Sequence, residues 1–253
     1  MPDARGHTQS RLAEDLSAFG VAVGDVLFVH SSFKSLGKVD GGATAVVAAL
    51  ESVIGEGGLL LMPSFNLIGD RDERAAKWSL ADAVSSVGWL TEYFRQMPGT
   101  VRSDHYSHSV AARGKSAEQF VSGHLSDEGF GSPWDRKPWG KVYGSNSPMI
   151  RAYDRGGKIM MLGVDYESST YMHVVEVTYW NERLSQDPEA PFIWLDRTQM
   201  GKAWDRSGST KTGKIGDSES KLISIREYVD GLLEVVRADP DSYDRVKLGT
   251  RNV

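Results

Sequence analysis

Two short apolar runs separated by a helical stripe restrict this chain to few folds. Residues 25–30 form an apolar run of strand length, and apolar side chains recur at helical spacing over residues 43–54. Gly57 and Gly58 then precede a second apolar run over residues 59–62, which Pro63 ends. This order predicts a β-α-β unit of an open α/β sheet, with functional groups in the loops at the strand ends.

The rest of the chain continues the alternation. Further helices are predicted over residues 10–19, 89–97, 171–180 and 222–236, and further strands over residues 109–112, 158–164 and 192–195. Polar or glycine-rich connections are predicted over residues 66–84, 129–147 and 201–220. We therefore expect the α/β class, as a three-layer α/β/α sandwich in which residues 1–253 form a single domain with inserted loops.

The composition narrows the function. The chain has no cysteine, which excludes a disulfide scaffold, a thiolate metal site and a cysteine nucleophile. Its 34 acidic and 29 basic residues leave a formal net charge of -5, so no electrostatic footprint for nucleic acid is present. No window is apolar enough to span a bilayer, and the first residues lack the apolar core of a secretory signal. We expect a cytoplasmic protein with no membrane partner.

A polar loop follows the first predicted strand directly. Its residues are His30, Ser31, Ser32, Phe33, Lys34, Ser35, Leu36 and Gly37. Hydroxyls, a lysine and backbone N–H groups between a strand and a helix can hold a phosphate or pyrophosphate. The alternative is a Ser/Thr loop that only caps the following helix.

A second polar cluster lies between residues 163 and 176, where another apolar strand ends and a helix begins. On that helix His173 and Glu176 are three residues apart and share one face. A histidine accepts protons near neutral pH, and a carboxylate can fix its tautomer and stabilise its cation. Taken alone, this spacing is also typical of a surface ion pair.

Three other patterns indicate no chemistry of their own. Residues 208–214 approach a P-loop, but Ile215 stands where a magnesium-binding Ser or Thr is needed, so we interpret them as a mobile surface loop. His105, His108 and His124 lack a clearly spaced third ligand for zinc and are interpreted as structural. No Gly-x-Ser-x-Gly nucleophile elbow occurs.

Taken together in order and spacing, these segments resemble the aminoglycoside 3-N-acetyltransferase family, also called the antibiotic N-acetyltransferases. The resemblance runs from about residue 12 to residue 236. The segments that carry it are residues 29–37, 40–42, 58–65, 102–105, 109–114, 131–133, 162–164, 170–176 and 213–216.

This resemblance implies an acetyl-CoA-dependent acyltransferase without a metal, active on the 3-amino group of aminoglycosides. It implies that the loop from Ser31 to Gly37 cradles the pantetheine and phosphates of acetyl-CoA, and that His173 is the general base. Glu176 is the candidate for the carboxylate that orients this histidine. Direct transfer in a ternary complex is expected, and the absence of cysteine excludes a thioester-enzyme intermediate.

A polycationic acceptor calls for carboxylates in its site. Asp70 matches the position of an acidic substrate contact in the family, and the further candidates for the acceptor site are Asp165, Glu167, Thr170 and Asp205. Residues 192–214 depart from the family pattern, in a region where substrate-selecting residues often lie. Acetylation of another small amine, a nucleotide-binding or metal-dependent hydrolase, and a non-catalytic aminoglycoside-binding protein remain alternatives. The sequence indicates no oligomeric state.

Overall fold

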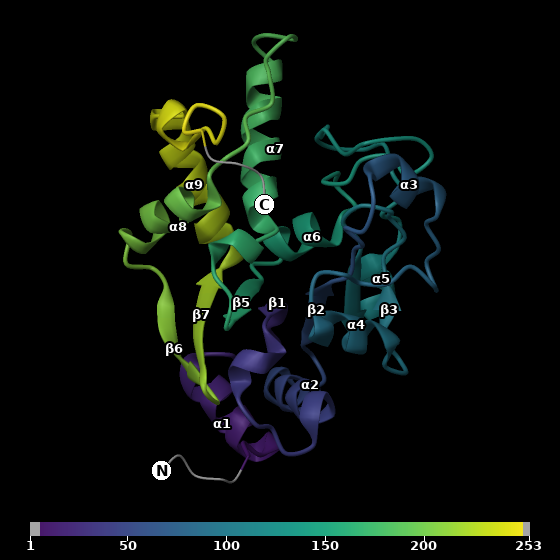
Figure 1. Ribbon diagram of the computed structural model, residues 1–253, viewed down its shortest axis with the longest axis vertical. Helices are drawn as coiled ribbons and strands as arrows, with labels where there is room; N and C mark the ends of the chain where they lie inside the picture. Colours follow the sequence, from purple (N-terminus) through teal and green to yellow (C-terminus); the bar gives the residue numbers. More distant parts are fainter. Residues whose placement is uncertain (1–5, 250–253) are drawn as a thin grey trace.

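The computed structural model describes residues 6–249, which build a seven-stranded mixed sheet with helices on both faces (Figure 1). The strand order is β3-β4-β2-β1-β5-β7-β6. The strands are β1 (Val26–Ser31), β2 (Leu59–Pro63), β3 (Val101–Arg102), β4 (Val110–Arg113), β5 (Lys158–Leu162), β6 (Lys211–Ile215) and β7 (Ser218–Ser224).

The α-helices within the described residues are α1 (Gln9–Phe19), α2 (Gly42–Ile54), α3 (Arg71–Ala76), α4 (Trp89–Gln96), α5 (Ala117–Val121), α6 (Pro148–Asp154), α7 (Tyr171–Leu184), α8 (Arg197–Asp205) and α9 (Ile225–Ala238). Short 3-10 helices are η1 (Phe33–Leu36), η2 (Tyr166–Ser168) and η3 (Asp241–Tyr243).

Strand β1 occupies the centre of the sheet and runs parallel to both of its neighbours. Val26 pairs with Leu59 of β2, and Ser31 pairs with Leu162 of β5. Strands β4 and β7 continue the sheet antiparallel to β2 and β5. Because parallel strands end at the same edge of a sheet, the segments that follow β1, β2 and β5 meet there.

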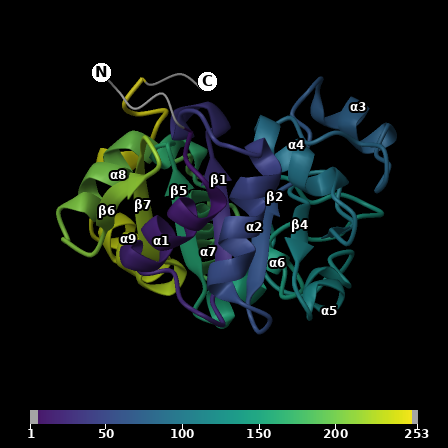
Figure 2. The same ribbon diagram turned by 90° about the horizontal axis from the view of Figure 1, so that it is seen from below.

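Side chains of the central strands alternate between two hydrophobic cores, since successive residues of a strand point to opposite faces. Phe28 of β1 lies in the core formed with α5 to α9, whereas Leu27 and Val29 lie in the core formed with α1, α2 and α4. Figure 2 looks from the side of α1 and α2 and shows both in front of the sheet, with α7 and α9 behind it. The predicted α/β class, with helices on both faces, is confirmed.

The predicted strand over residues 192–195 is wrong. Leu195 makes only an isolated bridge with Asp244 and belongs to no strand of the sheet. Phe192 and Trp194 instead pack edge-on against Trp134, with ring centroids 5.9 and 5.4 Å apart. These apolar side chains pack in an aromatic cluster instead of pairing in a sheet. Hydrophobicity alone does not distinguish the two arrangements.

The polar connection predicted over residues 201–220 is also wrong, and so is the surface loop predicted at residues 208–214. Most of this region forms α8 and the hairpin of β6 and β7, in which Gly213 pairs with Ser220. Strand β6 is an edge strand with four of its five residues at least partly exposed, so its sequence stays polar and pairing decides its conformation. Residues 222–224, which were predicted to begin a helix, belong to strand β7, and α9 begins at Ile225.

Candidate active site

A cavity of about 370 Å³ opens at the sheet edge where β1, β2 and β5 end. Side chains from all three chain segments reach it, along with residues from α3, α7 and the start of α8. Its lining includes His30, Ser31, Pro63, Phe65, Val164, Thr170, His173, Arg197, Arg74, His108 and Trp134. The sheet topology thus brings together groups that are far apart in the sequence.

His173 and Glu176 form a buried pair on α7. The His173 Nδ1 atom lies 2.6 Å from Glu176 Oε2, as their three-residue helical spacing predicts. The second carboxylate oxygen of Glu176 accepts the backbone N–H of Leu195 at 2.8 Å. Both carboxylate oxygens therefore have partners, and the imidazole is fixed in orientation at the cavity wall.

Arg197 determines which nitrogen of His173 carries the proton. A guanidinium group only donates hydrogen bonds, and the Arg197 Nη2 atom lies 2.6 Å from His173 Nε2. The Nε2 atom must therefore accept, which places the proton on Nδ1, where it is donated to Glu176. This is the tautomer that a general base requires, and its Nε2 lone pair is directed at the Arg197 guanidinium group.

Burial and the nearby Arg197 and Arg245 guanidinium groups hold the pKa of His173 well below its ordinary value. The imidazole is thus neutral at neutral pH. Burial raises the pKa of Glu176 to about 8, whereas the Leu195 N–H and the Arg197 and Arg245 charges act in the opposite direction. Because its two oxygens accept hydrogen bonds from Leu195 and His173, the geometry favours the carboxylate form.

The predicted cofactor loop is divided between the cavity and the core. His30 and Ser31 line the cavity, and the buried Ser31 Oγ atom has no hydrogen-bond partner among the described residues. Leu36 is fully buried in the core, so its side chain is closed to a ligand. Lys34 is exposed, and Phe33 packs against Trp89 with ring centroids 4.8 Å apart.

Several backbone N–H groups of this loop already have partners. The N–H of Ser32 donates to the Leu162 carbonyl at 2.8 Å, and that of Ser35 donates back to Ser32 at 3.1 Å. Gly37 donates to Lys34. A ligand bound to this loop would therefore contact hydroxyl groups and one lysine, rather than a row of free backbone amides.

The residues predicted for the acceptor site are only partly brought together. Thr170 and Glu167 line the cavity, and the Thr170 Oγ1 atom lies 3.3 Å from His30 Nε2. Asp70 instead caps the start of α3, where its carboxylate accepts the Glu73 N–H at 2.9 Å. It is exposed and does not line the cavity, because capping a helix turns the side chain back onto its own chain.

Asp165 and Asp205 also lie outside this cavity. Asp205 accepts the Tyr166 hydroxyl and pairs with Lys221 at 3.2 Å. Asp165 lines a neighbouring open cavity of about 470 Å³ together with Ser35, Asp217 and Glu219. The two cavities share Val164 and Ser168, so they adjoin.

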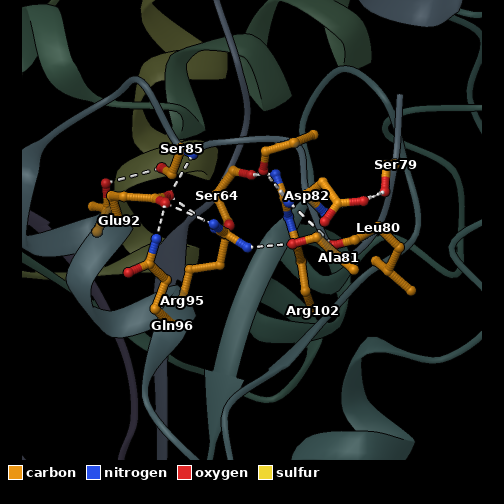
Figure 3. Close-up of polar contacts among 12 residues, drawn as sticks. Ser64, Ser79, Leu80, Ala81, Asp82, Ser85, Glu92, Arg95, Gln96 and Arg102 are labelled. Atoms are coloured by element: carbon orange, nitrogen blue, oxygen red, sulfur yellow. Dashed lines mark hydrogen bonds and ion pairs between the residues drawn. The ribbon is translucent and has the colours of Figure 1, made fainter. Parts of the chain in front are cut away.

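One wall of the cavity is the segment of residues 66–87, which is hydrogen-bonded to Arg95 of α4 and Arg102 of β3 (Figure 3). Arg102 donates to the Ala83 carbonyl at 2.5 Å, and Arg95 donates to the Ala81 carbonyl at 2.7 Å. Burial lowers the pKa of Arg102 to about 10. A segment with little regular structure is thereby given a defined position.

The clustered histidines are buried in the structure. His124 bonds to Ser103 Oγ and to the Val142 carbonyl, each at 2.9 Å, and the His105 ring packs against it. The His108 ring lies 5.4 Å from that of His173 and bonds to Ser107 Oγ. Across residues 6–249, no group of three or more metal-ligating side chains is placed to hold an ion.

Among the residues that line the cavity, the sequence predicted no role for Arg74, Trp134 and Arg197, and His108 was interpreted as structural. Arg197 lies 24 residues from His173 in the chain, in the segment that departs from the family pattern. No local motif marks it, and the departure from the pattern was the one signal available. Within residues 6–249, no helix has the length and apolar character required to cross a bilayer.

The family profile and the relatives that match this chain belong to one family. A family profile described as aminoglycoside 3-N-acetyltransferase matches residues 28–237. The chain is 31% identical to aminoglycoside N(3)-acetyltransferase III of Salmonella sp, over 96% of this chain and 82% of the relative. It is 27% identical to the aminoglycoside N(3')-acetyltransferase-like protein YokD of Bacillus subtilis (strain 168), over 88% of this chain and 90% of YokD.

Solved structures share the fold. The enzyme AAC-IIIb, in a binary complex with CoASH, superposes with a TM-score of 0.74 at 24% identity, over 92% of this chain and 97% of that chain. The AAC(3)-IVa apoenzyme superposes with a TM-score of 0.76 at 23% identity, over 96% of this chain and 93% of that chain.

Proposed function

Because the chain belongs to the aminoglycoside 3-N-acetyltransferase family, we propose that it transfers the acetyl group of acetyl-CoA to a primary amine, with His173 as general base. The 3-amino group of aminoglycosides is the first candidate acceptor. The observation that carries the proposal is the buried pair of His173 and Glu176 at the wall of the cavity, which leaves His173 Nε2 as a hydrogen-bond acceptor, bonded to Arg197 in this structure.

The chemistry is one displacement at the thioester carbonyl. His173 Nε2 accepts a proton from the amine as its nitrogen attacks the carbonyl carbon, and the carbon–sulfur bond breaks to release the CoA thiolate. The proton then passes from His173 to the thiolate, so an amide and CoA thiol are the products. Glu176 keeps the proton on Nδ1 and stabilises the imidazolium that forms in between.

The loop after β1 fits the thioester end of acetyl-CoA. Ser31 offers a buried hydroxyl without a partner among the described residues, in the cavity that His173 also lines, which suits a carbonyl oxygen of the thioester or the pantetheine arm. Ser35 lines the adjoining open cavity, and Lys34 is exposed nearby for a phosphate. These residues would hold the co-substrate between the two cavities.

The test is the release of thiol from acetyl-CoA, measured across aminoglycosides with and without a free 3-amino group. Release confined to acceptors with that amine would support both the reaction and its position. In His173→Ala we expect acetyl-CoA still to raise the melting temperature, while kcat falls by roughly 10²–10⁴-fold. Near-normal turnover in this variant would refute the assignment of the base.

A second candidate acceptor is a small amine of another kind. The observation that favours it is the charge of the cavity beside His173, where two arginines and only one glutamate are the charged groups in the lining. Thiol release with such an amine and none with aminoglycosides would decide for this candidate.

A further inference from the structure

The charges beside His173 are opposite in sign to those that a polycation requires. Arg74 and Arg197 line the cavity, and Glu167 is the one carboxylate in its lining. Glu167 is itself engaged, since its carboxylate lies 3.3 Å from Arg245 and accepts the Thr198 hydroxyl at 2.9 Å. An ammonium group that enters this cavity therefore meets an excess of positive charge.

Neither cavity arginine forms a direct ion pair with a carboxylate of the described residues, and the compensating charge nearest to Arg197 is Glu176, which contacts the other ring nitrogen of His173. Arg197 donates to the Glu167 backbone carbonyl at 2.5 Å and to His173 Nε2 at 2.6 Å, both uncharged acceptors. Arg74 has a buried Nε atom without a hydrogen-bond partner. Among residues 6–249, no carboxylate forms an ion pair with either guanidinium group. Buried or partly buried charges are ordinarily paired, so these two call for a ligand.

The phosphates of acetyl-CoA do not account for Arg197. This guanidinium group touches the general base itself, so any group bound to it lies at the reacting centre. In acetyl-CoA the whole pantetheine arm separates the phosphates from the thioester. A phosphate on Arg197 would therefore place the thioester away from His173.

The acidic residues of the adjoining cavity do not reverse this charge. Of its three acidic residues, Asp217 lies 3.0 Å from His7 and Glu219 lies 3.3 Å from Lys214, whereas Asp165 accepts the Glu167 N–H at 3.1 Å and forms no ion pair among the described residues. They also line the open cavity rather than the one that contains His173. The charge immediately around the reactive amine is therefore determined by Arg74 and Arg197.

We propose that the acceptor is an amine that also carries an anionic group, a phosphate or a carboxylate, which Arg74 and Arg197 bind together. This inference rests on the proposed acetyl transfer and names its substrate class. Guanidinium groups present paired N–H donors that match the oxygens of both anions.

The same contact would expose the base. In the structure Arg197 occupies the Nε2 lone pair of His173 that the amine needs. An anion on the acceptor draws the guanidinium group toward itself and leaves Nε2 free for the amine proton. A neutral or cationic amine provides no such attraction, so it binds less well and also reaches a base that is still occupied.

The test uses matched pairs of acceptors at saturating acetyl-CoA: glucosamine with glucosamine 6-phosphate, and propylamine with β-alanine. Neamine serves as the polycationic acceptor. We expect the anionic member of one pair to exceed its neutral partner in kcat/KM by roughly tenfold or more. The pair that shows the preference tells a phosphate acceptor from a carboxylate acceptor.

Variants connect the preference to the two arginines. In Arg74→Gln and Arg197→Gln we expect the preference for the anion to fall to within about twofold, and in Arg197→Lys to be intermediate, because lysine keeps the charge without the paired donors. Arg206→Gln, an exposed arginine at the end of α8, is the matched control and should keep the full preference.

A binding measurement keeps the two proposals separable. With CoA at saturation, glucosamine 6-phosphate should raise the melting temperature more than glucosamine, and Arg197→Gln should remove the difference. If no acceptor releases thiol but this difference is present, acetyl transfer fails and the anion site stands. If neamine is preferred, if no anion preference appears in either assay, or if the preference survives in both glutamine variants, the inference is overturned.

Discussion

At the scale of single residues, the candidate site depends on one lone pair. His173 is useful as a base only while its proton sits on Nδ1, and two groups enforce this: Glu176 accepts the hydrogen bond from Nδ1–H, and Arg197 donates a hydrogen bond to Nε2. Helical spacing in the sequence predicted the contact with Glu176. The contact with Arg197 could not be predicted, since it joins α7 to the start of α8.

Glu176→Gln tests this arrangement with almost no change in shape. The amide oxygen can still accept the Leu195 N–H, which turns the NH₂ group toward His173 Nδ1 and shifts the ring proton to Nε2. We expect kcat to fall by roughly 10²–10⁴-fold with little loss of stability. Glu182→Gln, on the same helix and paired with Arg237 outside the site, is the control and should leave turnover unchanged. Equal kcat in the two variants would remove Glu176 from the mechanism.

At the scale of elements, the end of β5 fixes the loop that follows β1. Gly163 has φ +68°, and a Cβ atom placed there would lie 2.5 Å from Ser35 Cβ and 2.6 Å from Ser218 Oγ. The loop with Ser35 therefore packs where any other residue would carry its side chain. This close approach explains why a glycine follows the strand, beyond the backbone conformation that it also permits.

A pair of alanine variants separates the two demands on that glycine. Gly156 has φ +65° and nothing within 4 Å of an added Cβ, so Gly156→Ala should cost only the backbone strain, roughly 1–2 kcal/mol. Gly163→Ala should cost this strain and also displace the Ser35 loop, with a larger loss of stability and weaker binding of acetyl-CoA. Urea unfolding and calorimetric titration give the two values. Identical behaviour of the two variants would contradict the packing role.

At the scale of the whole molecule, the structure buries histidines that must stay neutral. Burial lowers the pKa of His30 to about 3, that of His105 to about 2 and that of His124 to about 4. In the unfolded chain each titrates near its ordinary value of 6.5. Below pH 6.5 the unfolded chain therefore binds more protons than the folded protein, and unfolding becomes easier as pH falls.

We expect the free energy of unfolding to fall between pH 6.5 and about 4, by up to about 1.4 kcal/mol per pH unit for each of these histidines. Urea unfolding at several pH values measures the slope. His124→Gln should reduce the slope by about one proton, even if it lowers stability at every pH. A flat profile in the unmodified protein would contradict this account.

The sequence by itself determined the central frame. Strands β1, β2 and β5 and helices α2 and α7 follow from local hydrophobic periodicity, and the His173–Glu176 contact follows from helical spacing, because these depend on neighbours in the chain. Only the tertiary structure decided that residues 211–215 lie at the edge of the sheet and that Arg74 and Arg197 face the cavity. Each depends on segments distant in the sequence, and a local pattern carries no information about such segments.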